Sequence, residues 1–290
     1  MALVVNADAA QFDSMCREPW RFYRTASIAK RDGSGRSLLI PHEQLMSVQR
    51  RLVRHDLARF VNHPADHCRL GRSVITNAWR HVRHRYVSAY DIADCYPSIQ
   101  PEMVRAALRR AGMTAADSDL VVKLTTVCRQ LPQGAPTSPA LLSIALHRVD
   151  CQLSARAARH GIVYTRYVDD LFFSGNASIA FFDREVRTVL SDAGFAIRRD
   201  KRRRWGPGHR PTLAGVVLAT RPTIHPEYVD GVRRLMHNMR EAGHSPSAAD
   251  VDAVLGKIGW IAQLRPRAAH LLKAELAKWQ QVAIGGSPTL

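Results

Sequence analysis

The sequence predicts an α+β fold with a mainly antiparallel sheet. Expected strands and helices intermingle along the chain, which is typical of this class. Residues 161–175, GIVYTRYVDDLFFSG, are predicted to form a strand, a turn with two aspartates and a second strand. At 290 residues the chain is long enough for a sizeable core, built either as one large domain or as two or three subdomains.

The first half of the chain contains three expected helices and one expected strand. Residues 43–62 space apolar side chains along one helical face, with arginines on the other. Residues 86–99 are expected to form a strand. The next helix, 101–112, opens with Pro101 and ends at Gly112. A long amphipathic helix is predicted over 138–161.

The second half begins with the aspartate hairpin and ends in helices. After the hairpin, a helix is predicted over 178–195 and a strand over 210–219. Two closing helices are expected at 226–243 and 247–264.

The charge of the chain points to a polyanionic partner. Lys and Arg number 42 against 25 acidic residues, which gives a formal net charge of +17 and a pI near 10.5. Nucleic acid is therefore the leading expectation, and a basic surface kept for solubility is the alternative. No apolar stretch approaches the roughly 18 residues of a membrane span, and the start MALVVNADAA does not resemble a signal peptide. We expect a cytoplasmic protein that does not contact a membrane.

The cysteines do not suggest a framework of disulfides or a zinc site. There are five, an odd number, and no two have the Cys-x-x-Cys spacing. We expect reduced thiols.

Asp169 and Asp170 stand side by side between two apolar strands. A buried carboxylate without a partner is costly, and a divalent metal at the hairpin tip could neutralise both. Asp91, on the strand expected earlier, could supply a third ligand. Three carboxylates from two strands suit a pair of magnesium ions about 4 Å apart, as in phosphoryl transfer. The alternative is an ordinary Asx turn.

Six segments, in order, resemble the motifs of reverse transcriptases. They are IAKRDGSGRSLLIP (28–41), DIADCYPSI (91–99), LPQGAPTSP (131–139), YVDD (167–170), AGFAIRRDKRR (193–203) and LAGVVL (213–218). The resemblance implies a right-hand polymerase fold. Fingers and the N-terminal region would cover 1–88, a palm with interleaved fingers helices 89–225, and a helical thumb 226–290.

The same resemblance implies roles for individual residues. Asp91, Asp169 and Asp170 would hold two Mg²⁺ ions, with Asp169 the more direct ligand. Tyr96 would lie under the sugar of the nucleotide and exclude a 2′-hydroxyl. The other residues expected to bind the deoxynucleoside triphosphate are Lys30, Arg36, Asp94, Gln133, Gly134 and Lys201.

A further motif is similar to a signature of retron reverse transcriptases. Asn77-Ala78-x-x-His81 matches their Asn-Ala-x-x-His pattern, and on a helix the two polar side chains would face the same way. They could contact a folded RNA or fasten the helix to its neighbours. Gly215 and Lys257 are also expected to contact RNA. One departure is Leu213-Ala214-Gly215, where retron enzymes typically have Val-Thr-Gly.

The retron resemblance implies an RNA-directed DNA polymerase. Such an enzyme copies a structured noncoding RNA into single-stranded DNA, primed from an RNA 2′-hydroxyl, and acts in defence against phages. Its partners would be that RNA, the RNA–DNA hybrid product, deoxynucleoside triphosphates and a toxin or effector protein. One alternative is another defence-associated or group II intron-like reverse transcriptase without a retron RNA. The other is a non-catalytic RNA-binding protein on a polymerase fold, against which the intact aspartates argue.

Overall fold

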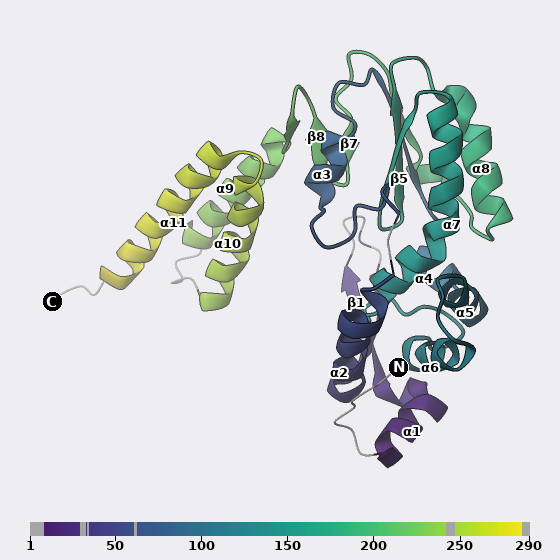
Figure 1. Cartoon of the computed structure of the whole chain (residues 1–290). Helices are drawn as coiled ribbons and strands as arrows, with labels where there is room; N and C mark the ends of the chain where they lie inside the picture. The colour runs from purple at the N-terminus through teal and green to yellow at the C-terminus, as the bar shows by residue number, and fades with distance from the viewer. Residues whose placement is uncertain (1–8, 30–32, 34, 61–62, 242–246, 286–290) are drawn as a thin grey trace. The chain divides into compact units, whose positions relative to one another are not determined.

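The chain forms two compact units. The computed structural model describes residues 9–29, 33, 35–60, 63–241 and 247–285. One unit comprises Met1–Arg80 with His84–Pro207, and the other His81–Arg83 with Gly208–Leu290 (Figure 1). Each has its own cluster of buried apolar side chains. The boundaries expected for fingers, palm and thumb stay a prediction.

The first unit contains a four-stranded sheet in the order β4-β5-β3-β6. Its strands are β3 (Tyr86–Asp91), β4 (Val163–Tyr167), β5 (Asp170–Gly175) and β6 (Arg203–Trp205). All three neighbouring pairs are antiparallel. The α+β class and the antiparallel sheet are therefore confirmed, and so is the hairpin predicted around the two aspartates.

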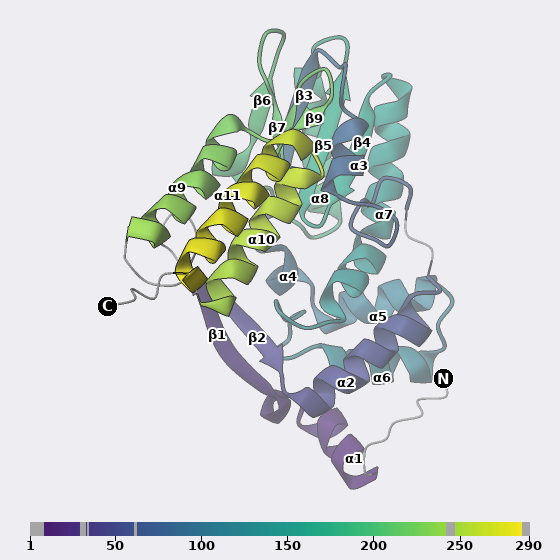
Figure 2. The same ribbon diagram turned by 90° about the vertical axis from the view of Figure 1, so that its left-hand side faces the viewer.

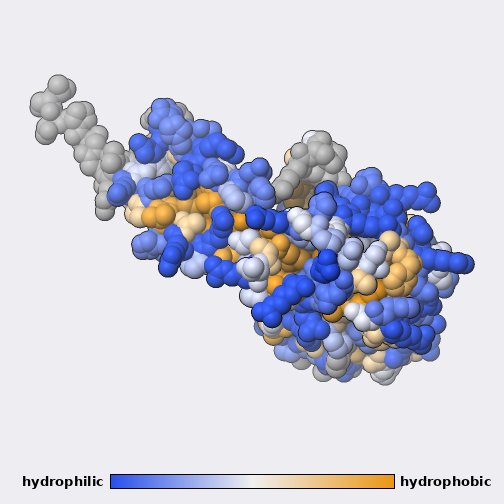
Figure 3. All heavy atoms as spheres, turned by 90° about the horizontal axis from the view of Figure 1, so that it is seen from above, coloured by the Kyte–Doolittle hydropathy of each residue, from blue (hydrophilic) through white to orange (hydrophobic). Residues whose placement is uncertain are grey.

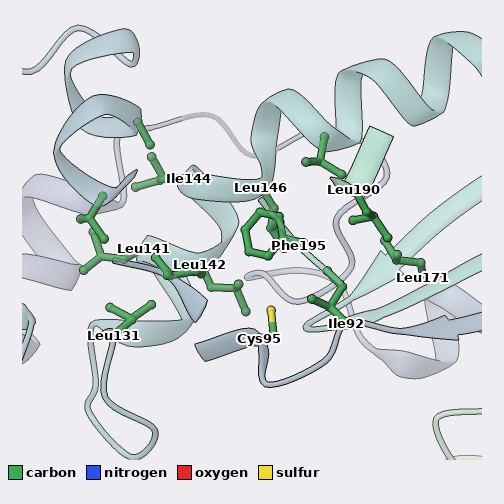
Figure 4. Close-up of a cluster of buried hydrophobic side chains, with 14 of the residues drawn as sticks. Ile92, Cys95, Leu131, Leu141, Leu142, Ile144, Leu146, Leu171, Leu190 and Phe195 are labelled. Carbon is green, nitrogen blue, oxygen red and sulfur yellow. The ribbon is translucent and has the colours of Figure 1, made fainter. Parts of the chain in front are cut away.

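One face of this sheet packs on two helices, α7 (Ser138–Arg159) and α8 (Asp183–Asp192). Because side chains alternate along a strand, Leu171 and Phe173 of β5 point to the same face. Phe173 stacks on Tyr164, with ring centroids 4.8 Å apart. Figure 4 shows Leu171 beside Leu190 of α8. The hairpin is thus anchored through one face of the sheet.

The rest of the first unit is mainly helical. Helices α1 (Ala9–Arg17), α2 (Glu43–Arg51) and α5 (Pro101–Arg110) each contact α6 (Ala115–Thr125), and Figure 2 shows α2, α5 and α6 close together. Two strands, β1 (Tyr23–Ala29) and β2 (Gly35–Pro41), pair as an antiparallel hairpin. The remaining short helical elements are η1 (Pro19–Phe22), η2 (Leu52–Leu57), α3 (Val74–Trp79), α4 (Cys95–Ser98), η3 (Ala180–Phe182) and η4 (Arg199–Lys201).

Over its described residues, the second unit combines a small sheet with three helices. Strands β7 (Thr212–Leu213), β8 (Val216–Leu218) and β9 (Pro222–Thr223) pair antiparallel. The helices are α9 (Pro226–Glu241), α10 (Ala248–Ala262) and α11 (Pro266–Gly285). Their buried side chains, among them Val232, Val254 and Leu272, form the apolar cluster of this unit. The two closing helices expected from the sequence are confirmed, and α11 is a third.

Two expected elements are shorter than predicted. The helix expected over 43–62 is α-helical only to Arg51, continues as the π-helix η2 and ends at Leu57. The strand expected over 86–99 stops at Asp91, because Asp94 has a left-handed backbone with φ of 43° and α4 begins after it.

Two more expected elements are divided. The helix expected over 178–195 begins with the 3₁₀ turn η3 before α8. The strand expected over 210–219 is a hairpin, since Ala214 and Gly215 have φ of 45° and 86° and turn the chain between β7 and β8.

Hydrophilic side chains cover most of the surface visible in Figure 3, as expected for a chain with a net charge of +17. Over the residues that the structure describes, no helix is long and apolar enough to cross a membrane.

The packing of Phe173 predicts a large cost on truncation. Phe173 is 1% exposed, and we expect Phe173→Ala to lower the free energy of unfolding by about 3–5 kcal/mol, since it leaves a cavity behind the hairpin. The matched control is Phe181→Ala, at a side chain that is 57% exposed, with an expected change below about 1 kcal/mol. Urea unfolding followed by circular dichroism measures both. Equal losses would contradict the assignment of Phe173 to the core.

Candidate active site

The sheet brings three aspartates together at one end. Asp91 of β3 and Asp170 of β5 are direct partners in the antiparallel register, so their side chains share a face and their Cα atoms lie about 4.5–5.5 Å apart. Asp169 lies in the β4–β5 turn, and its carbonyl accepts a hydrogen bond from the backbone N–H of Ile92 at 3.1 Å. The three residues singled out from the sequence are therefore neighbours.

The turn that carries the aspartates has an uncommon backbone. Val168 and Asp169 form the loop between Tyr167 and Asp170, and Val168 has a φ of 59°. Left-handed backbone is rare for a β-branched residue, and the first position of such a loop favours glycine when φ is positive. This conformation costs about 1–3 kcal/mol, which the surrounding contacts must supply.

Two basic side chains neutralise Asp91. The carboxylate, 14% exposed, is paired with Lys201 Nζ at 3.4 Å and with Arg198 Nε at 3.6 Å. Arg198 also pairs with Asp94, at 3.1 Å. Lys201 thus pairs directly with Asp91, and Arg198 joins Asp94 to Asp91, while binding of the nucleotide by Asp94 and Lys201 stays a prediction. Arg198 was not predicted, because nothing distinguishes it within the basic run around it.

The environment disfavours charge on the carboxylates. Burial, followed by the charges of Asp169 and Asp91, raises the pKa of Asp170 to about 7. Burial is also the main cause of a raised pKa at Asp169. Among the described residues, no group of three or more His, Cys, Asp or Glu side chains is arranged to hold a metal ion as it stands. Clustered carboxylate oxygens are nevertheless the donors that a hard divalent cation prefers.

Two of the residues expected around the nucleotide interact electrostatically with the triad. Tyr96, on α4, has a pKa raised by burial and then by the charge of Asp169. Arg36, on β2, lowers the pKa of Asp169 through its charge, although burial outweighs it. Lys30 lies outside the described residues.

The loop containing Gln133 and Gly134 packs against β2. The carbonyl of Gln133 accepts a hydrogen bond from the N–H of Leu39 at 2.9 Å. Gly134 has a φ of 117°, and a Cβ there would lie 3.3 Å from the carbonyl oxygen of Leu39. A residue with a side chain fits poorly here, so the loop can approach β2 only with glycine at this position.

Asn77 and His81 do not share a helix. Helix α3 begins with a capping box at Ser73 and ends at Trp79, so the helical position expected for His81 is wrong. Asn77 is 0% exposed, and its Oδ1 accepts a hydrogen bond from the hydroxyl of Thr165 on β4. Asn77 therefore fastens α3 to the sheet, one of the two alternatives for the motif. His81 is 1% exposed, and contact of either residue with RNA stays a prediction.

Gly215 and Lys257 lie in the second unit. Gly215 is in the β7–β8 turn with open space around its Cα, and Lys257 is exposed on α10. Both positions leave room for a ligand, and their contact with RNA also stays a prediction.

An antiparallel sheet with three aspartates at one end and helices packed on one face is the palm of a right-hand polymerase. The chain belongs to the reverse transcriptase family: residues 28–208 match the family described as "Reverse transcriptase (RNA-dependent DNA polymerase)".

Curated relatives are retron enzymes. The chain is 28% identical over 298 residues to the Retron Mx162 reverse transcriptase of Myxococcus xanthus, covering 90% of this chain and 61% of the relative. It is 31% identical over 279 residues to the Retron Mx65 reverse transcriptase of the same organism, covering 88% and 64%. The Retron Ec86 reverse transcriptase of Escherichia coli is 22% identical over 268 residues, covering 89% and 82%. The chain thus spans less than two thirds of the length of the two Myxococcus relatives.

The structure also resembles a solved telomerase. Telomerase from Candida albicans, in complex with the TWJ fragment of telomeric RNA, matches with a TM-score of 0.54 and 11% identity. The match covers 92% of this chain and 55% of that chain. This similarity shows the polymerase fold.

The hydrogen bond of Asn77 predicts a structural effect. Asn77→Ala removes the acceptor for the buried Thr165 hydroxyl, and we expect it to lower the free energy of unfolding by about 1–3 kcal/mol. Trp79→Ala, on the same helix but at a side chain that is 54% exposed, is the control and should cost less than about 1 kcal/mol. Thermal unfolding of both variants measures the difference. A fully stable Asn77→Ala protein would show that the bond contributes nothing.

Proposed function

We propose that this chain is an RNA-directed DNA polymerase of the retron type. It copies a structured noncoding RNA into single-stranded DNA, primed from a 2′-hydroxyl of that RNA. The observation that carries the proposal is the pairing of Asp91 with Asp170, with Asp169 in the adjoining turn, in a chain of the reverse transcriptase family. The retron names of the relatives support the choice of type.

Asp91, Asp169 and Asp170 would hold two Mg²⁺ ions. When bound, the ions activate the attacking hydroxyl and stabilise the leaving phosphate oxygens. The donor set fits them, because burial and mutual repulsion raise the pKa of Asp170 to about 7 and a cation would relieve that repulsion. Asp91 would exchange its partners Arg198 and Lys201 for metal, and Lys201 would then be available to the triphosphate.

The nucleotide would bind between the triad and the β1–β2 hairpin. Arg36 and Lys30 would face the triphosphate, while Gln133, Gly134 and Asp94 line the pocket. Tyr96 would lie beneath the sugar, and its ring would leave no space for a 2′-hydroxyl. The half-buried position of Tyr96 on α4, five residues after Asp91, supports this role.

The RNA would be held largely through its phosphates and shape. A net charge of +17 supports binding of a polyanion, which should weaken steeply with salt. Gly215 and Lys257, which are exposed, are the residues that we propose to contact it, whereas the buried Asn77 and His81 would shape the surface that the RNA meets without touching it. The enzyme would act in the cytoplasm in defence against phages, together with a toxin or effector protein.

Sequencing of the nucleic acid that copurifies with the protein from its native host tests the proposal. A retron enzyme should retain one structured RNA joined to DNA through a 2′–5′ linkage. Unrelated RNAs without linked DNA would contradict the retron type and favour another defence-associated or group II intron-like reverse transcriptase.

Removing one negative charge from the triad should abolish DNA synthesis. Asp91→Asn and Asp169→Asn each replace a carboxylate with a neutral amide, which binds Mg²⁺ far more weakly. We expect the rate of primer extension, with Mg²⁺ as the sole divalent ion, to fall by at least about a thousandfold, or about 4 kcal/mol. The matched control is Asp192→Asn, at an exposed carboxylate near the end of α8, which should extend primers normally. Near-normal extension by either triad variant would remove the assignment.

Truncating Tyr96 should admit ribonucleotides. Tyr96→Ala opens space beneath the sugar, and we expect selectivity for dGTP over GTP to fall more than about tenfold, which corresponds to 1.4 kcal/mol. Tyr96→Phe keeps the ring and should retain the selectivity. Competition assays with both nucleotides measure the ratio, and unchanged discrimination in Tyr96→Ala would refute the gate.

A further inference from the structure

Arg166 is a fully buried arginine directly behind the aspartate turn. It lies on β4 and is 0% exposed. Its Nε donates to both oxygens of Asp150 on α7, at 2.9 and 3.1 Å, and its Nη2 donates to Asp150 Oδ2 at 2.8 Å. The same Nη2 lies 3.0 Å from Asp66 Oδ2. The remaining nitrogen, Nη1, donates to the carbonyl of Val168 at 2.8 Å.

The acceptors of Arg166 are themselves held in place. Asp150 also accepts a hydrogen bond from the hydroxyl of Tyr164 at 2.7 Å. The N–H of Arg166 donates to the carbonyl of Ala65, and the N–H of His67 donates to the carbonyl of Arg166, both at 2.8 Å. Asp66 is thereby bridged to β4. The guanidinium is therefore held by α7, through Asp150, and by the loop around Asp66, which lies far from β4 in the sequence.

The charge of this group is secured by its partners. Burial alone would lower the pKa of Arg166, but the carboxylates of Asp150 and Asp66 outweigh it and raise the pKa. The side chain therefore stays a cation with fixed donors. One of those donors is committed to the residue with the uncommon backbone, since Val168 has a φ of 59°.

We propose that Arg166 is a positioning residue for the candidate active site, which ties Asp150 and Asp66 to the Val168 carbonyl and so fixes the turn that aims Asp169 and Asp170. Arg166 acts through the turn and does not touch the substrate. Lysine could not replace it, because a single ammonium lacks the planar fork that grips Asp150 with one edge while bonding Val168 with another nitrogen. The catalytic part of this inference rests on the proposed function, whereas the conformational part does not.

The test compares Arg166→Lys with Tyr164→Phe. Both change the hydrogen bonding of buried Asp150, but only the first removes the bond to the turn. Three quantities are measured on protein shown to be folded by circular dichroism. They are hydrogen exchange of the amides at 167–171, Mn²⁺ affinity by electron paramagnetic resonance, and the kcat and KM for a deoxynucleotide in primer extension.

For Arg166→Lys we expect the amide hydrogens at 167–171 to exchange at least about tenfold faster and the affinity for Mn²⁺ to be at least about tenfold weaker. We also expect kcat to fall at least about tenfold, while KM changes less than about threefold. Tyr164→Phe should remain within about threefold of the unmodified protein on every measure. If Arg166→Lys does not fold, Asp66→Asn keeps the guanidinium but weakens its anchor and should shift exchange and Mn²⁺ affinity in the same direction.

The proposal is overturned if exchange and Mn²⁺ affinity of the folded Arg166 or Asp66 variant match the unmodified protein, or if Tyr164→Phe shows the same changes as Arg166→Lys. An unmodified protein that fails to extend primers refutes the proposed function, and the exchange and Mn²⁺ measurements still decide the role of Arg166. If the unmodified protein extends primers but the amides at 167–171 exchange equally fast in the variants and in the unmodified protein, the role of Arg166 is refuted and the proposed function stands.

Discussion

The repulsion among three carboxylates at one end of an antiparallel sheet is the interaction on which the rest of the site depends. Asp91 and Asp170 are fixed as register partners, so the two strands cannot separate them without losing the sheet. Lys201 and Arg198 supply compensating charge from the segment before β6. A divalent cation that binds between the carboxylates relieves their repulsion and so stabilises the site. Phosphoryl transfer catalysed by two metal ions requires a site that binds cations in this way.

Ion pairs formed by the buried residues Arg166 and Asp183 fix the strands that carry these carboxylates. Arg166 joins β4 to α7 through Asp150, while Asp183 of α8 accepts from Tyr90 on β3 and pairs with Arg202 and Arg204 around β6. Ion pairs of this kind are weak evidence for stability, because desolvation offsets their attraction. We therefore interpret them as determinants of geometry: they hold strands and helices in the one arrangement that brings the aspartates together.

Much of this arrangement could be predicted from the sequence, since it follows from local patterns. Apolar periodicity located α7, α9 and α10, helix start and stop signals located α5, and alternating strands around two aspartates located the hairpin. Partners distant in sequence could not be found in the same way. Arg166 stands in a strand whose pattern does not reveal that its partners are Asp66 and Asp150, and Arg198 is one arginine in a basic run. The end of β3 lies just before Asp94, a residue with a left-handed backbone that carries no glycine signal in the sequence.

We propose that Asp91, Asp169 and Asp170 together bind divalent cations. Anomalous diffraction from crystals grown with Mn²⁺, an RNA template, a DNA primer and a non-hydrolysable deoxynucleotide tests it most directly. We expect manganese peaks coordinated by carboxylates of all three aspartates, with Lys201 released from Asp91. Peaks elsewhere on the protein, or an Asp91 that keeps its ion pairs with Lys201 and Arg198 while nucleotide is bound, would contradict it.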